Sequence, residues 1–143
     1  MTIEITSDRA RMDVDTIHRY LSEESYWAAG IPLEVVERSI ANSLCFGAFD
    51  GRTQVGFARV ITDYATFGYL ADVFVVESHR RRGIAKDIMA AVMAHPELQT
   101  LRRWHLVTRD AHSLYARFGW MPLDAPERHM FITRKNAYAA RRC

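Results

Sequence analysis

A segment in the middle of the chain combines residue types that can hold an anion. The apolar run that ends at Val76 is followed by Arg80-Arg81-Arg82-Gly83-Ile84-Ala85, and the apolar spacing after Gly83 predicts a helix. Backbone N–H groups at a helix start have no intrahelical partner, and the helix dipole adds positive potential there. Glycine lets the backbone approach a ligand closely. The segment therefore suits a phosphate group, although a solvated basic turn fits the bare chemistry about as well.

Asp72 is a carboxylate inside an apolar run from Tyr69 to Val76. Charged groups are rarely buried without a function or a partner. In a regular strand Asp72 and Phe74 share one face, because side chains alternate. Two interpretations stay open. Asp72 binds a substrate amine or relays its proton, or it forms an ion pair with an arginine on a neighbouring strand, such as Arg59.

A second group of polar and aromatic residues lies near the N-terminus. Glu23, Glu24, Tyr26 and Trp27 fall within five positions, and acids next to aromatic rings can bind an ammonium group. The alternative is a solvated helix end in which Trp27 covers the core. Asp63 and Tyr64 form a weaker instance of the same pattern.

The elements that must position these residues follow from the hydrophobic pattern. We predict strands over 2–6, 44–49, 54–61, 66–76 and 104–108, and helices from Asp13 to about Ser25, from Pro32 onward, over 83–94 and over 111–118. Residues 23–30 form a loop, and segments 120–123 and 129–133 form a closing antiparallel pair. This order predicts an α/β fold with a mixed sheet, α+β in character, rather than a regularly alternating parallel one.

The composition bounds the class of protein. A length of 143 residues suits a single domain over 1–143. The net charge of +2 argues against a nucleic-acid partner, although 17 of the 19 basic residues are arginine. No apolar run is long enough to span a membrane. The two cysteines and six histidines show neither a disulfide framework nor metal-ligand spacing, so we expect a cytoplasmic protein without a metal.

The segment Arg80-x-x-Gly83-x-Ala85 resembles the Gln/Arg-x-x-Gly-x-Gly/Ala motif of the GNAT superfamily of acetyl-CoA-dependent N-acetyltransferases. The resemblance implies a central mixed, mostly antiparallel twisted sheet flanked by about four helices. It further implies that Arg80, Arg81, Arg82, Gly83, Ile84 and Ala85 hold the cofactor pyrophosphate. The preceding strand residues Phe74, Val75 and Val76 would pair with the pantetheine arm, and a bulge there would free a backbone N–H for an oxyanion.

A second block, Thr108 to Trp120, resembles the family segment Asn-x-x-Ala-x-x-Leu-Tyr-x-x-x-Gly-Phe, with Thr108 in place of asparagine and Trp120 in place of phenylalanine. The resemblance implies cofactor contacts at Thr108, Ala111, His112 and Tyr115. It makes Tyr115 the general acid, because a phenol with a reference pKa of about 10 can donate to a thiolate of about 8.5. Without the resemblance, the residues favour a core aromatic role for Tyr115, because aromatic side chains usually pack.

The resemblance predicts an enzyme that moves an acetyl group from acetyl-CoA, its co-substrate, to a primary amine by direct attack in a ternary complex. It places the loop with Glu23, Glu24 and Trp27 over the acceptor groove, together with Asp72. We expect a small-molecule amine as the acceptor and a homodimer through the C-terminal strands. The alternatives are a protein or peptide N-acetyltransferase and a non-catalytic acyl-CoA-binding regulator.

Overall fold

The computed structural model describes residues 2–138 and contains one five-stranded sheet in the order β1-β2-β3-β4-β5. The first four strands are antiparallel to their neighbours, and β5 runs parallel to β4. This confirms the predicted mixed, mostly antiparallel fold with four α-helices. The strands are Ile3–Thr6 (β1), Leu44–Asp50 (β2), Thr53–Thr62 (β3), Phe67–Val75 (β4) and Arg103–His105 (β5). The helices are Val14–Arg19 (α1), Leu33–Ala41 (α2), Ile84–Ala94 (α3) and His112–Ala116 (α4).

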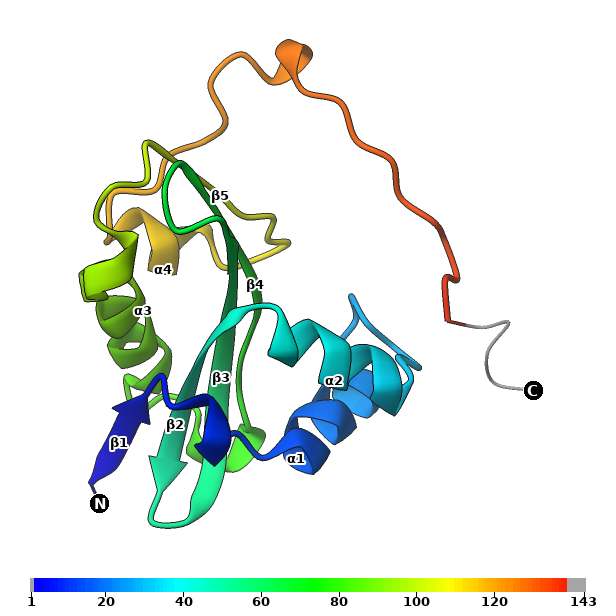
Figure 1. Cartoon of the computed structure of the whole chain (residues 1–143), viewed down its shortest axis with the longest axis vertical. Helices are drawn as coiled ribbons and strands as arrows, with labels where there is room; N and C mark the ends of the chain where they lie inside the picture. Colours follow the sequence, from blue (N-terminus) through cyan, green and yellow to red (C-terminus); the bar gives the residue numbers. More distant parts are fainter. Residues whose placement is uncertain (1, 139–143) are drawn as a thin grey trace.

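The two faces of the sheet are covered by different helices (Figure 1). On one face, α3 and α4 close a core that includes Val60, Leu70 and Val75 from the sheet and Ile88 from α3. On the other face, α1 and α2 close a second core that includes Phe57 and Phe74. Strand β4 therefore supplies side chains to both cores. Across residues 2–138, no helix has the length and hydrophobicity that crossing a bilayer requires.

The N-terminal helices begin where the sequence predicts. The Asp13 carboxylate accepts a hydrogen bond from the Thr16 N–H and caps α1, as a helix N-terminus favours. A π-helical turn over Tyr20–Glu24 extends this helix to Ser25, so the predicted loop starts two residues later than expected. Pro32 directly precedes α2.

Strand β4 contains a bulge. Ala71 pairs with Arg59 and Phe74 pairs with Phe57, so two residues of β4, Asp72 and Val73, lie opposite the single residue Ala58. Asp72 has a φ of +55°. The expected bulge thus exists, but it precedes Phe74 instead of lying within 74–76. The Val76 N–H is not free there, because it donates to the Val55 carbonyl at 2.9 Å.

The C-terminal part differs most from the prediction. The strand predicted over 104–108 is the three-residue β5, and the helix predicted over 111–118 is the shorter α4. The predicted antiparallel pair of 120–123 and 129–133 is wrong. The connection between them contains Ala125 at a φ of +51° and a 3₁₀ turn over Pro126–Arg128, and this geometry does not turn the chain back as a hairpin. Residues 129–138, here named the C-terminal arm, leave the body as an extended trace (Figure 1).

Candidate active site

A cleft opens where β4 and β5 separate. Their pairing ends at Tyr69 and His105, after which β4 continues to Val75 while the other chain segment leads into α4. The cavity between them measures about 380 Å³. Its walls are residues 70–73 of β4 and residues 106–108, and α4 contributes Tyr115. The parallel pair thus ends in a gap wide enough for an extended molecule to lie beside β4.

Asp72 lines this cleft and is also held in an ion pair. Its Oδ2 lies 2.9 Å from both Nε and Nη2 of Arg59, and its Oδ1 accepts a hydrogen bond of 2.8 Å from the Trp27 indole. The ion-pair interpretation is therefore confirmed. Both oxygens already accept hydrogen bonds, so Asp72 is a fixed polar group at the cleft and not a free carboxylate.

Tyr115 is buried, with 8% of its surface exposed, and it lines the same cleft. Burial raises the pKa of its phenol to about 12, with smaller contributions from Tyr26 and Asp110. The hydroxyl is therefore protonated at any physiological pH. Tyr115 fits both roles that the sequence allows. It packs as a core aromatic residue near Trp120, at a centroid distance of 6.2 Å, and its side chain also lines the cavity, as a general acid requires.

The Arg80–Ala85 segment follows the end of β4 and opens α3. Arg81 and Gly83 have φ angles of +66° and +77°, and Gly83 is the N-cap of α3. A Cβ added at Gly83 would meet no other atom within 4 Å, so the backbone there is open to an approaching ligand. Arg80 is fixed by two hydrogen bonds, from Nε to the Val75 carbonyl at 3.0 Å and from Nη2 to the Tyr20 hydroxyl at 2.8 Å.

Three of the other cofactor residues predicted around this segment, Phe74, Val75 and Ile84, face the cores. Phe74 stacks on Tyr20 at 4.0 Å in the α1–α2 core, and Val75 and Ile84 are buried in the α3–α4 core. None of the side chains of residues 74–76 lines the cleft. Arg81 and Arg82 are exposed, and Ala85 is half-buried.

A contact between Arg109 and Tyr26, here named the clamp, lies beside the cleft that Tyr26 lines. The Arg109 guanidinium lies 3.9 Å from the centroid of the Tyr26 ring, and the Arg109 N–H donates to the Tyr26 hydroxyl at 3.3 Å. Tyr26 also packs edge-on against Trp27. The contact joins the segment between α1 and α2 to the segment between β5 and α4.

The structure brings some of the other predicted residues to the cleft and leaves others outside. Trp27, Thr108 and Ala111 line it. The Thr108 hydroxyl accepts the Ala111 N–H at 3.1 Å and so fixes the start of α4. His112, Glu23 and Glu24 are exposed and do not line the cavity.

Val107 is a lining residue that the sequence analysis missed. It is 75% exposed beside the cleft. A single valine at the end of an apolar run carries no signal that distinguishes it from a strand residue.

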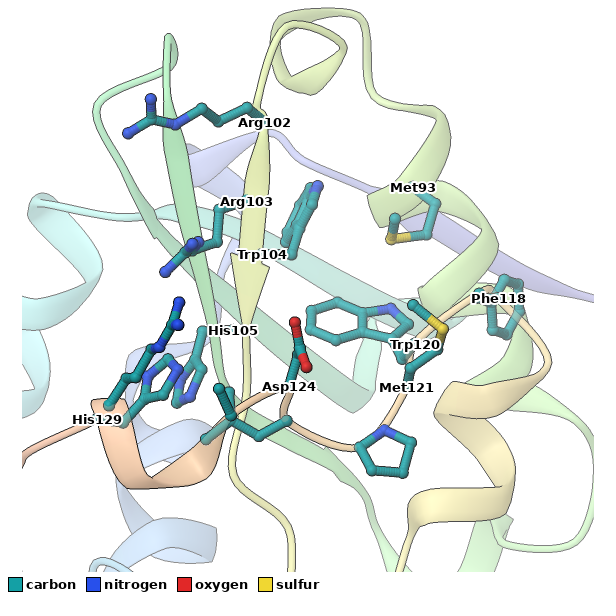
Figure 2. Close-up of a pocket in the computed structure, with 15 residues that line it drawn as sticks. Met93, Arg102, Arg103, Trp104, His105, Phe118, Trp120, Met121, Asp124 and His129 are labelled. Carbon is teal, nitrogen blue, oxygen red and sulfur yellow. The ribbon is translucent and has the colours of Figure 1, made fainter.

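A second, larger cavity of about 630 Å³ lies along β5 and the segment after α4, and contains no predicted site residue. We name it the β5 groove. Figure 2 shows Trp104 and Trp120 near its centre and His105 beside His129. Among residues 2–138, no group of three or more His, Cys, Asp or Glu side chains is arranged to hold a metal ion.

The sheet is mostly antiparallel, its last pair is parallel and ends after three residue pairs, and a glycine-containing turn and a helix follow the longer of those two strands. The chain belongs to the GNAT acetyltransferase family: the family model described as "Acetyltransferase (GNAT) domain" matches residues 41–122.

Individual relatives agree with this assignment. A Gibberella zeae protein named "Putative acetyltransferase" is 31% identical over 136 residues, which cover 79% of this chain and 75% of the relative. A crystal structure from Xanthomonas campestris pv. campestris, described as a "putative acetyltransferase belonging to the gnat family", is 50% identical and has a TM-score of 0.94 over 97% of this chain and 98% of its own. A Clostridium acetobutylicum "predicted acetyltransferase with acetyl-CoA" is 14% identical, with a TM-score of 0.66 over 91% of this chain and all of its own.

Proposed function

We propose that this protein transfers an acetyl group from acetyl-CoA to the primary amine of a small molecule. The observation that carries the proposal is the cleft between β4 and β5 with a buried phenol in its wall, together with the open backbone of the loop that follows β4. A structure of the same fold is described as containing acetyl-CoA. The bound co-substrate supplies a thioester whose acyl carbon takes the amine nitrogen and whose sulfur leaves as a thiolate.

The Arg80–Ala85 segment binds the pyrophosphate in this proposal. The open backbone at Gly83 and the positive end of α3 favour an anion. Arg80 fixes the loop through Val75 and Tyr20, and Arg80, Arg81 and Arg82 are all exposed. The pantetheine arm then extends along β4 toward the cleft, where β4 has no β5 partner.

Tyr115 holds its proton next to the leaving sulfur. Its pKa of about 12 lies about three to four units above that of an ordinary thiol, so complete transfer of the phenolic proton costs about 5 kcal/mol. Tyr115 therefore keeps its proton and stabilises the developing thiolate by hydrogen bonding, and the thiolate is protonated by the proton that the attacking amine releases.

The acceptor end of the cleft is formed by Trp27, Asp72 and the Tyr26–Arg109 clamp. The fixed Asp72 oxygens and the Trp27 ring can orient an ammonium group or its neutral amine. The clamp ties together the two segments that carry Trp27 and Thr108 of the cleft wall, and a wall held in this way favours a small amine over the peptide acceptor of a protein acetyltransferase.

Calorimetric titration with acetyl-CoA and desulfo-CoA, followed by CoA release across amino acids, polyamines, aminoglycosides and short peptides, tests the proposal. We expect binding of both cofactors and turnover on one class of small amine. Absence of binding would refute the cofactor site. Binding without turnover on any amine would support a CoA-binding regulator instead.

Tyr115→Phe separates the roles of binding and chemistry. We expect an unchanged Kd for desulfo-CoA and a turnover about 100-fold lower, the usual size of such a contribution. Tyr64→Phe is the matched control, because Tyr64 is an exposed residue outside the cleft. A loss smaller than threefold in Tyr115→Phe would remove this residue from the mechanism.

A further inference from the structure

The cleft between β4 and β5 has an electrically balanced wall. Asp72 and Asp110 are the acids that line it, and no lysine, arginine or histidine of residues 2–138 does. Each acid already has a cation beside it. Asp72 Oδ2 lies 2.9 Å from Arg59 Nη2, and Asp110 Oδ2 lies 3.7 Å from Arg109 Nη2. The Asp110 side chain is also 70% exposed, so water screens its charge. The wall therefore has no carboxylate or cation to spare for a second charged group of a ligand.

The rest of the wall is mostly apolar or aromatic. Large side chains that line it stay open to water: Tyr26, Trp27 and Val107 are 52%, 42% and 75% exposed. The rings of Tyr26 and Trp27 pack edge-on against each other at a centroid distance of 5.0 Å. Large apolar side chains that stay exposed together in one cavity are characteristic of a ligand-binding surface. The apolar body of a ligand would cover them.

The acids that the sequence offers for a polycation lie elsewhere. Glu23 and Glu24 are exposed and do not line the cavity. Asp63 is in the turn between β3 and β4, where its Oδ1 accepts the backbone N–H groups of residues 65–67 at 2.8 to 3.2 Å. A polyamine or an aminoglycoside carries several ammonium groups, and this cleft offers a carboxylate to none beyond the first.

A charge without a counter-ion in the cleft would lose part of its hydration and gain nothing in return. This cost applies to the carboxylate of an amino acid and to the second ammonium of a diamine. It does not apply to a monoamine, because its one ammonium meets Asp72 and Trp27 and then gives a proton to water before the reaction. A wall without a spare carboxylate also favours that loss, since desolvation lowers the pKa of an ammonium group.

We propose that the acceptor is an apolar primary monoamine, with one amine on an alkyl or aryl body, no carboxylate and no second cation. The inference rests on the proposed acetyl transfer and names the class of its acceptor. The neutral amine nitrogen bonds to the acetyl carbon, the carbon–sulfur bond of the thioester breaks, and an N–H proton goes to the departing sulfur. The products are an uncharged amide and CoA, so the acylated molecule leaves with no charge.

Initial rates of CoA release by the full chain at saturating acetyl-CoA test the proposal with matched amines. From propylamine to hexylamine, kcat/KM should rise about threefold with each added methylene, as for a CH₂ group that leaves water. Hexylamine should exceed cadaverine, in which an amine replaces the terminal methyl, by about tenfold or more. Phenethylamine should exceed phenylalanine, which adds a carboxylate, by about the same factor.

The outcomes separate this inference from the proposed function. Turnover of cadaverine or phenylalanine at rates equal to or above those of hexylamine and phenethylamine would overturn the inference and leave acetyl transfer standing. The same holds if only polyamines, aminoglycosides or amino acids react. If no amine of any class releases CoA, acetyl transfer itself is refuted, and the inference with it.

Val107→Asp tests whether the missing charge sets the preference. Val107 is exposed, so the substitution removes nothing from either core, and Val107→Asn is the matched neutral control. An added carboxylate at an exposed position should lower the preference for hexylamine over cadaverine about two- to fivefold in Val107→Asp, with no change in Val107→Asn. The same preference in both variants would show that the balance of charge does not select the acceptor and would overturn the inference.

Discussion

Gly83→Ala separates the backbone requirement of the loop from the requirement of the proposed ligand. Gly83 has a φ of +77°, and an added Cβ meets nothing within 4 Å. The only cost to folding is therefore the left-handed conformation, about 1 kcal/mol for an L-residue. For a chain of this length that lowers the Tm by about 4 °C. If the phosphate accepts backbone N–H groups at this point, the methyl group displaces at least one charge-assisted hydrogen bond of about 1.5–3 kcal/mol. The Kd for desulfo-CoA should then rise about 10- to 150-fold.

Gly51→Ala is the control for this comparison. Gly51 lies in the β2–β3 turn, has a φ of +61°, and also leaves open space for a Cβ. Calorimetric scanning should show the same small loss of stability in both variants, while isothermal titration shows weaker binding only in Gly83→Ala. Equal affinities in the two variants would mean that the ligand does not approach the backbone at Gly83, and the cofactor loop would have to be placed elsewhere.

Three further predictions follow from the ionisable groups. Because burial raises the pKa of Tyr115 to about 12, ionisation of this phenol should not lower the rate of acetyl transfer up to about pH 10. A pH–rate profile that falls near pH 9 in the wild type but not in Tyr115→Phe would contradict this. Burial raises the pKa of the Cys45 thiol from 9.0 to about 11, so the unfolded chain loses this proton first and stability falls as pH rises from about 9 to 11; urea unfolding should show a flatter decline in Cys45→Ala. The side chains of Arg59 and Asp72 are 15% and 10% exposed, so Arg59→Met leaves a largely buried carboxylate without its cation and should lower the free energy of unfolding by about 3 kcal/mol. Urea unfolding should show that adding Asp72→Asn recovers part of this loss. If nothing is recovered, the loss does not come from the unpaired charge of Asp72.

The sequence predicts the fold well where local signals and burial agree. Asp13 and Pro32 mark the starts of two helices, and the Asp50-Gly51 turn joins two long strands at the expected place. The fold prediction is wrong after Gly119, where the expected antiparallel pair of strands does not form. The run from His129 to Thr133 reads as a strand because composition reports β-propensity, but propensity does not say which edge the strand will meet. In this chain, no edge of the described residues pairs with it.

The candidate site shows the same division. The sequence predicts the Arg80–Ala85 segment, Tyr115, Asp72 and Trp27, because glycine, buried acids and aromatic residues stand out in their context, and the last three line the cleft. The positions of Glu23, Glu24 and His112 outside the cleft are not visible in the sequence, since exposure depends on the rotation of a helical turn. The use of both Asp72 oxygens by Arg59 and Trp27 depends on tertiary contacts across 13 and 45 positions of the chain.

The bulge at Asp72–Val73 shifts the alternation of side chains between the two faces of β4 by one residue. Leu70 and Val75 both face the α3–α4 core although one number is even and the other odd, and Phe74 faces the opposite core. Regular pairing without the bulge, with every residue of β4 kept, would restore simple alternation and turn every following side chain of the strand over. Phe74 would then enter the space shaped for a valine, and Val75 would leave the ring of Tyr20 unstacked. One extra residue thus decides how volume is divided between the two cores.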